Sequence, residues 1–160
     1  LTEPATPYVE RFVEDVDVAK VLTAASVLAK ARVVGYPADG PRTALHKMRD
    51  ENYSSLLVVE RDYRLRGMVT VDDVEQALLR EHSSLDDVLQ SEIPAVTPDT
   101  PLTELFGLLS DFPWPLPVVD ERQRLQGVVL RAAVLETLAH ERAATTEPLQ
   151  RTVKQEIANA

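Results

Sequence analysis

Residues 65–73 read Leu65-Arg66-Gly67-Met68-Val69-Thr70-Val71-Asp72-Asp73, and the residues 60 positions later read Leu125-Gln126-Gly127-Val128-Val129-Leu130-Arg131-Ala132-Ala133. Both segments begin with a short apolar run that is typical of a strand and continue into residues spaced as in a helix. Because similarity at a fixed distance is the signature of a repeated structural unit, we predict that the chain contains two copies of one fold.

The similarity extends in both directions from these segments. With the same shift of 60, the residues that match are Pro41, Thr43, Leu45, Leu56, Val58, Val59, Val74, Leu78 and Glu81 in the first half, against Pro101, Thr103, Leu105, Leu116, Val118, Val119, Val134, Leu138 and Glu141 in the second. The two halves are therefore homologous, and each copy covers about 60 residues.

Each copy predicts the order β-α-β-β-α. A proline at the first helical position starts the first helix, and Thr100 is expected to cap the second copy's helix. An antiparallel hairpin and a closing helix follow. One copy alone covers its small sheet poorly, so we expect an α+β fold in which two copies pack sheet to sheet about a pseudo-twofold axis. The expected segments are 32–34, a helix from Pro41, 55–59, 65–70 and 71–81, then 94–97, a helix from Pro101, 116–119, 125–130 and 131–141.

Composition excludes several classes of protein. The net charge of −9 over 160 residues argues against a binder of nucleic-acid backbones. No run approaches the roughly 18 apolar residues of a membrane-spanning helix. Cysteine is absent, which is compatible with a reducing cytosol and excludes thiolate chemistry. A basic cluster at Arg61, Arg64 and Arg66 is interrupted by Asp62, and we interpret it as a solvated hairpin turn.

Catalysis has no support in the sequence. His46, His82 and His140 lack the spacing of metal ligands, and no Walker A motif is present. The adjacent acids Asp72 and Asp73 stand at a helix start, where they favour the helix dipole. We therefore expect a regulatory fragment and not an enzyme.

The repeat with its Gly-Met-Val-Thr-Val-Asp-Asp ending resembles the CBS domain family, whose members occur as tandem pairs called Bateman modules. In that family the junction of sheet and helix often holds an adenosine compound, through the pattern Gly-x-x-Thr/Ser-x-x-Asp. Gly67, Thr70 and Asp73 match this pattern. Leu130 and Ala133 replace the last two residues in the second copy, so the resemblance implies at most one such site.

A closer resemblance is to the C-terminal region of the ATPase subunit of glycine betaine/proline ABC importers. It is carried by Tyr8-Val9, Phe12 and Val16-Asp17, by segments 40–45 and 100–105, and by Pro117-Val118-Val119-Asp120-Glu121. It implies four regions: 1–20, a linker and helix following an ATPase domain absent from this chain; 21–82, the first CBS repeat; 83–142, the second; and 143–160, a frayed or disordered tail.

The first of these regions has an amphipathic pattern. Residues Tyr8, Val9, Phe12, Val13 and Val16 lie on one side of a predicted short helix, and charged residues lie on the other. The apolar face of this helix requires a partner.

Two interpretations of the candidate site residues stay open. Thr70 and Asp73 have the spacing of a capping box, in which the hydroxyl and the acid satisfy backbone amides. The same position at a helix start also favours phosphate, and Asp73 is suited to ribose hydroxyls. Trp114, between Pro113 and Pro115, is either a hydrophobic plug at a rigid corner or a stacking surface for a base or a partner.

The resemblance implies a regulatory module located at the cytoplasmic face of the membrane through an attached ATPase and the transporter permease. No cofactor is required; the expected regulatory ligand is an adenine nucleotide, namely AMP, ATP or cyclic di-AMP. Three hypotheses compete: a nucleotide sensor that uses Thr70 and Asp73, a sensor of ionic strength, and a structural CBS dimerisation module without ligand, free-standing or attached. A homodimer is expected in each case.

Overall fold

The computed structural model describes residues 22–140. The first repeat consists of β1 (Val33–Gly35), α2 (Pro41–Glu51), β2 (Ser55–Val59), β3 (Leu65–Thr70) and α3 (Val71–Leu79). Its sheet has the order β1-β2-β3, in which β1 is parallel and β3 antiparallel to β2. The predictions for residues 1–20 and 143–160 lie outside the described residues.

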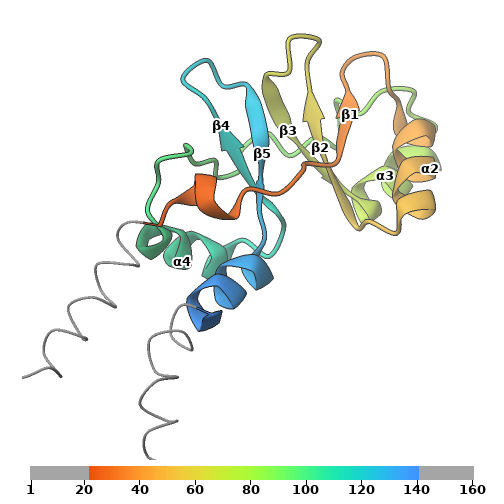
Figure 1. Ribbon diagram of the computed structural model, residues 1–160. Coiled ribbons are helices and arrows are strands. Elements are labelled where there is room, and N and C mark those ends of the chain that lie inside the picture. Colours follow the sequence, from red (N-terminus) through yellow and green to blue (C-terminus); the bar gives the residue numbers. More distant parts are fainter. Residues whose placement is uncertain (1–21, 141–160) are drawn as a thin grey trace, which may run out of the picture.

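The second repeat has the order α-β-β-α, because residues 94–97, predicted as its first strand, form no strand (Figure 1). It consists of α4 (Leu102–Asp111), β4 (Leu116–Val119), β5 (Leu125–Val129) and a helix over residues 131–140. Val96 forms a single parallel bridge to Val118, in the place that β1 occupies beside β2. The predicted α+β fold with two related units is therefore confirmed, and the first strand of the second unit is reduced to this single bridge.

Other small differences from the prediction concern the ends of strands and helices: β1 spans Val33–Gly35 and not 32–34, and β5 ends at Val129 and not at residue 130. Helix α2 begins at Pro41 as expected, but α4 begins at Leu102, and Pro101 is its N-cap. Thr100 does not cap this helix, because its hydroxyl accepts a hydrogen bond of 3.2 Å from the backbone amide of Thr97. The first closing helix, expected to reach residue 81, ends at Leu79.

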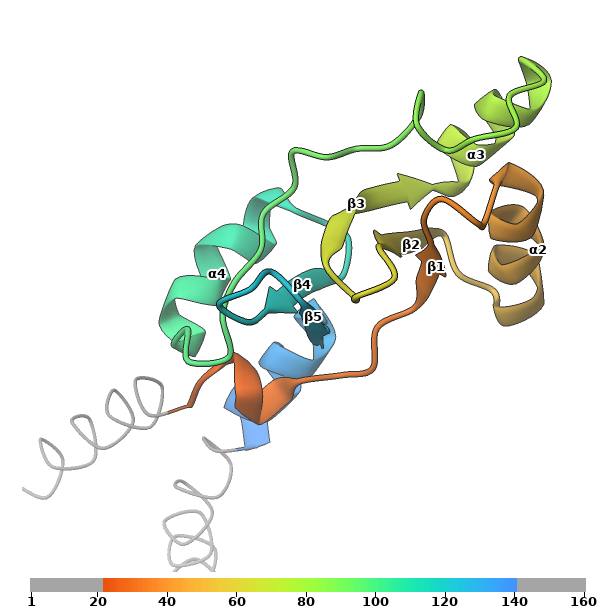
Figure 2. The same ribbon diagram turned by 90° about the horizontal axis from the view of Figure 1, so that it is seen from above.

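Each sheet has one face covered by its own helices and one face turned to the other repeat (Figure 2). Helices α2 and α3 enclose Val34, Met48, Leu56 and Val74, and the equivalent core of the second repeat includes Leu102, Leu105, Leu116, Val129 and Val134. A third cluster joins the repeats: Leu57, Val59 and Met68 with Val119, Leu125 and Val128. The predicted packing of sheet against sheet is thus confirmed.

The segments that precede the repeats pack against the opposite repeat. Helix η1 (Ala24–Val27) contributes Ala24 and Val27 to the core of the second repeat. Ala29 exchanges two backbone hydrogen bonds with Val128, of 2.8 and 2.9 Å. In the same way, Gln90 exchanges two bonds of 2.9 Å with Met68, and Leu85 enters the first core.

Candidate ligand site between the repeats

Gly67 and Gly127 allow these crossing segments to approach the hairpins. A Cβ atom on Gly67 would lie 2.4 Å from the carbonyl oxygen of Gln90, and one on Gly127 would lie 2.5 Å from that of Ala29. Both distances are too short for any side chain. The glycine of the pattern Gly-x-x-Thr-x-x-Asp therefore has a packing role in both repeats, including the repeat that has lost the two polar residues.

Thr70 and Asp73 form the predicted capping box at the start of α3. The Thr70 hydroxyl accepts from the Asp73 amide at 3.2 Å, and the Asp73 carboxylate accepts from the Thr70 amide at 2.9 Å. The Asp73 carboxylate also accepts a bond of 2.7 Å from Nε2 of Gln90. Thr70 is buried, Asp73 is half-buried and Gln90 is exposed. Gln90 therefore contacts both Gly67, through its carbonyl group, and Asp73, through its side chain, so that Gly67, Thr70 and Asp73 lie in one cluster.

A cavity lies at the equivalent place in the second repeat. Here Leu130 stands in the position of Thr70, and Ala29 crosses β5 as Gln90 crosses β3. Ala29 contributes only a methyl group at the position where Gln90 contributes a longer side chain. The cavity has a volume of about 330 Å³, and its lining includes Ala29, Lys30, Arg32, Tyr53, Leu57, Met68, Trp114, Val128 and Leu130.

The cavity combines an apolar floor with aromatic and cationic walls. Leu57, Met68 and Val128 belong to the cluster that joins the repeats. On the wall, the Nε of Arg32 donates a hydrogen bond of 2.7 Å to the Tyr53 hydroxyl, and its guanidinium lies 5.1 Å from the centre of the Tyr53 ring. Such a surface suits a planar ring system that carries negative charge.

Trp114 packs as the interpretation of a hydrophobic plug expects, and stacking on a base or a partner stays a prediction. Its half-buried ring packs against the cluster between the sheets and also lines the cavity. Sequence reasoning singled out Trp114 but missed Ala29, Lys30, Arg32 and Tyr53. The available signal was two cations just before the first strand and an aromatic residue just before the hairpin.

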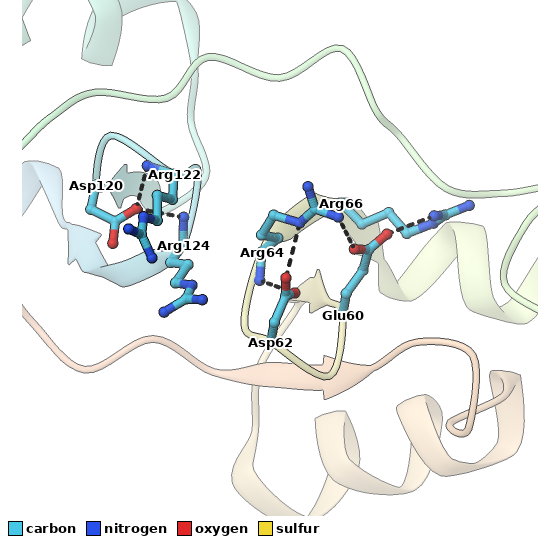
Figure 3. A network of polar contacts seen from close by, with 7 residues as sticks. All are labelled: Glu60, Asp62, Arg64, Arg66, Asp120, Arg122 and Arg124. Carbon is cyan, nitrogen blue, oxygen red and sulfur yellow. Dashed lines mark hydrogen bonds and ion pairs between the residues drawn. The ribbon is translucent and has the colours of Figure 1, made fainter.

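In the basic cluster of the first hairpin, Arg61 and Arg64 are exposed as predicted for a solvated turn, but Arg66 lies on β3, is half-buried and stacks over the ring of Tyr36 (Figure 3). Arg64 pairs with Glu60 at 3.3 Å and with Asp62 at 3.1 Å, and Arg66 pairs with Glu60 at 3.1 Å. In the second hairpin, the Asp120 carboxylate accepts from the amides of Arg122 and Arg124 at 2.8 and 2.9 Å. The carboxylates therefore hold the turns in shape.

Within residues 22–140, no group of His, Cys, Asp and Glu side chains is placed to hold a metal ion. Nor is any helix of these residues long and apolar enough to cross a membrane.

The arrangement of two related α+β units defines a class, and the family model described as "CBS domain" matches residues 19–80 and 85–140. The chain belongs to the CBS domain family. It is 41% identical over 139 residues to the glycine betaine transport ATP-binding protein OpuAA of Bacillus subtilis, a match that covers 87% of this chain and 33% of that protein. The chain therefore spans about a third of the length of this relative.

Solved structures give the same classification. The structure of Staphylococcus aureus OpuCA is 30% identical with a TM-score of 0.64, and the match covers 71% of this chain and 97% of that chain. The CBS pair CBSX2, solved in complex with AMP, is 22% identical with a TM-score of 0.65 and covers 75% of this chain and 98% of that chain. At this lower identity the second likeness shows the fold.

Proposed function

We propose that this chain is the regulatory module of the ATPase subunit of an osmoprotectant importer for glycine betaine or proline, and that it responds to an adenine nucleotide. The relationship to a glycine betaine transport ATP-binding protein supports the setting. Since the chain spans about a third of that relative, the ATPase chemistry belongs to the remaining part of such a subunit. The module then acts in the cytoplasm, at the membrane, through its attached ATPase and the permease.

The cavity between the repeats is the observation that carries the ligand class. Its volume of about 330 Å³ falls within the range of about 300–1,000 Å³ that small-molecule sites occupy. Trp114 and Tyr53 offer aromatic surface to an adenine ring, and Lys30 and Arg32 offer positive charge to phosphate. The solved CBS pair that holds AMP supports this ligand class.

The cluster of Gly67, Thr70 and Asp73 is a second candidate location for the same ligand. The Asp73 carboxylate already accepts an N–H donor from the exposed side chain of Gln90. A ribose hydroxyl is also a donor, so it can replace the Gln90 amide when that side chain swings into solvent. In this arrangement Asp73 binds ribose and Thr70 continues to cap α3.

Calorimetric titration with AMP, ATP and cyclic di-AMP tests the proposal and separates the two locations. Loss of binding in Trp114→Ala with retention in Asp73→Ala assigns the ligand to the cavity, and the opposite result assigns it to the first junction. Circular dichroism of both variants controls for folding. If none of the three nucleotides binds saturably to the unmodified chain, the nucleotide proposal fails, and the sensor of ionic strength and the structural module remain.

The proposed module works as a homodimer, because an importer of this kind needs two copies of its ATPase. Sedimentation velocity over a range of protein concentrations tests this part independently of any ligand. A dimer that forms without nucleotide supports it, and a monomer at all concentrations contradicts it for the isolated module.

A further inference from the structure

The two junctions between hairpin and closing helix differ in the sign of the charge that they offer to a ligand. At the first junction, the carboxylate of Asp73 accepts a hydrogen bond of 2.7 Å from Gln90. At the second, Leu130 and Ala133 stand in the positions of Thr70 and Asp73. The described residues that line the cavity there include two cations and no carboxylate. The two junctions are therefore suited to different chemical groups of a ligand.

A ribose needs hydrogen-bond acceptors, because each of its free hydroxyl groups donates a proton. A carboxylate is a strong acceptor for such a donor. Among the described residues of the cavity lining, the side-chain oxygens are the neutral hydroxyls of Tyr53, Ser54 and Ser55. Hydrogen bonds between neutral groups are roughly half as strong as those to a charged group. Ribose hydroxyls therefore add little to binding in this cavity.

Arg32 is a cation whose position at the cavity is fixed. Its Nε donates a hydrogen bond of 2.7 Å to the Tyr53 hydroxyl, and its backbone carbonyl accepts one of 3.0 Å from the amide of Leu57 in β2. The carboxylate of Glu51 lies 3.8 Å from the same Nε, beyond hydrogen-bond distance. Within residues 22–140 the two terminal nitrogens of the guanidinium make no hydrogen bond, so their N–H groups can bind a ligand.

Tyr53 is held in place by the end of helix α2. Asn52, the C-cap of this helix, adopts the left-handed conformation with a φ of 57°. The amide of Tyr53 then donates a hydrogen bond of 2.8 Å to the carbonyl of Met48. This closing turn fixes the backbone from which the half-buried Tyr53 ring reaches Arg32. The end of α2 therefore sets the direction of the Arg32 guanidinium.

A phosphate is the ligand group that this guanidinium fits, because its planar N–H groups match two oxygens of one anion. Lys30 also lines the cavity, but it is exposed, so salt screens its charge more strongly. Building on the proposed function, we propose that the cavity selects an adenine nucleotide by its phosphate and not by its ribose. Arg32 determines this specificity, and Tyr53 is its positioning residue.

Calorimetry with AMP, 2′,3′-dideoxy-AMP and adenosine tests the selectivity. We expect 2′,3′-dideoxy-AMP to bind within about threefold of AMP, and adenosine to bind at least about tenfold more weakly. If only cyclic di-AMP binds, its 2′-deoxy analogue replaces the dideoxynucleotide, and the Arg32 variant described next replaces adenosine. A greater loss from removing the ribose hydroxyls than from removing the phosphate overturns this inference but not the proposed function. Failure of AMP, ATP and cyclic di-AMP alike overturns both.

Substitution of Arg32 tests which residue carries the selectivity. Arg32→Gln should lower the affinity for AMP, or for cyclic di-AMP, at least about tenfold and leave the affinity for adenosine unchanged. Arg32→Lys keeps the charge and should keep part of the preference. Arg42→Gln is the matched control, because it removes an exposed cation of α2 in the same repeat. Equal losses for AMP and adenosine in Arg32→Gln contradict the assignment.

Tyr53→Phe tests the positioning role, because it keeps the ring and removes the hydroxyl that holds Nε of Arg32. The preference for AMP over adenosine should fall several-fold, with the affinity for adenosine and the circular dichroism spectrum unchanged. A residue that only shapes the cavity would weaken both ligands equally. Either that result or an unchanged preference contradicts the role of Tyr53.

Discussion

The two junctions between hairpin and closing helix have the same backbone and opposite contents. At the first junction, Thr70 and Asp73 keep the polar pattern, but the side chain of Gln90 fills the place next to them. At the second, Leu130 replaces the threonine, and the small Ala29 leaves a cavity of about 330 Å³. The first repeat therefore keeps the polar pattern, and the second repeat has the space for a ligand. For this reason the pattern alone does not locate the site.

The largest expected effect tests whether the two glycines have one packing role. Gly67→Ala and Gly127→Ala each place a methyl group about 2.4–2.5 Å from a backbone oxygen, and we expect each to lower the free energy of unfolding by about 2–3 kcal/mol. Urea denaturation measures both. Gly107→Ala in α4 is the matched control, since its Cβ meets nothing within 4 Å, and it should stabilise by about 0.5–1 kcal/mol. A harmless Gly127→Ala would show that only the first junction depends on close approach.

The second prediction fills the cavity with the side chain that stands at the other junction. Ala29→Gln should reduce the affinity for an adenine nucleotide at least about tenfold, or about 1.4 kcal/mol, because the longer side chain occupies the ligand volume. Calorimetry measures the change. Gln90→Ala is the reciprocal variant, which frees the Asp73 carboxylate and should not weaken binding in the cavity. Unaltered affinity in Ala29→Gln would move the ligand to the first junction.

The third prediction transfers the capping box. Leu130→Thr combined with Ala133→Asp gives the helix over 131–140 the cap that α3 has, and should raise the free energy of unfolding by about 1 kcal/mol. Leu130 is 40% exposed, so its replacement also loses some buried apolar surface, and the gain should stay below the upper limit of about 2 kcal/mol for a cap. Conversely, Asp73→Ala removes the cap of α3 and should lower the free energy of unfolding by about 0.5–2 kcal/mol, with the fold intact. Thermal unfolding of both variants decides; no gain from the transfer would show that the second junction cannot adopt the cap geometry.

The smallest expected effect concerns a contact of the first repeat. Hydrogen bonding to the Asp86 carboxylate raises the pKa of Tyr36 above its usual value of 10.0, against the lowering effect of Arg66, whose guanidinium lies 3.8 Å from the centre of the ring. The folded protein then keeps this proton after the unfolded chain has lost it, so stability falls as pH rises above about 10. Tyr36→Phe should lack this part of the decline. Urea unfolding at pH 9 and pH 11 compares the two, and equal slopes would contradict the contact.

Much of this fold is local and was predictable. The strands 55–59, 65–70 and 116–119 were predicted to the residue, because β-branched runs end at charged turns. The crossing of Ala29 and Gln90 was not predicted, since a single pair of backbone bonds leaves no periodic pattern. The capping box followed from the spacing of Thr70 and Asp73. The cavity did not, because it depends on the missing side chain of Ala29 and on segments distant in sequence.

The segment that precedes each repeat packs against the other repeat, so neither hydrophobic core is complete until residues far along the chain have been synthesised. Leu85 belongs to the first core, so that core stays open until the ribosome has passed the nominal end of the first repeat. Ala24 and Val27 become buried later still, because Leu102 and Leu116, which belong to the same core, are synthesised about 80 residues after them. A nascent chain stopped between the repeats therefore exposes apolar surface at both ends, and release of the whole module is needed for cooperative folding.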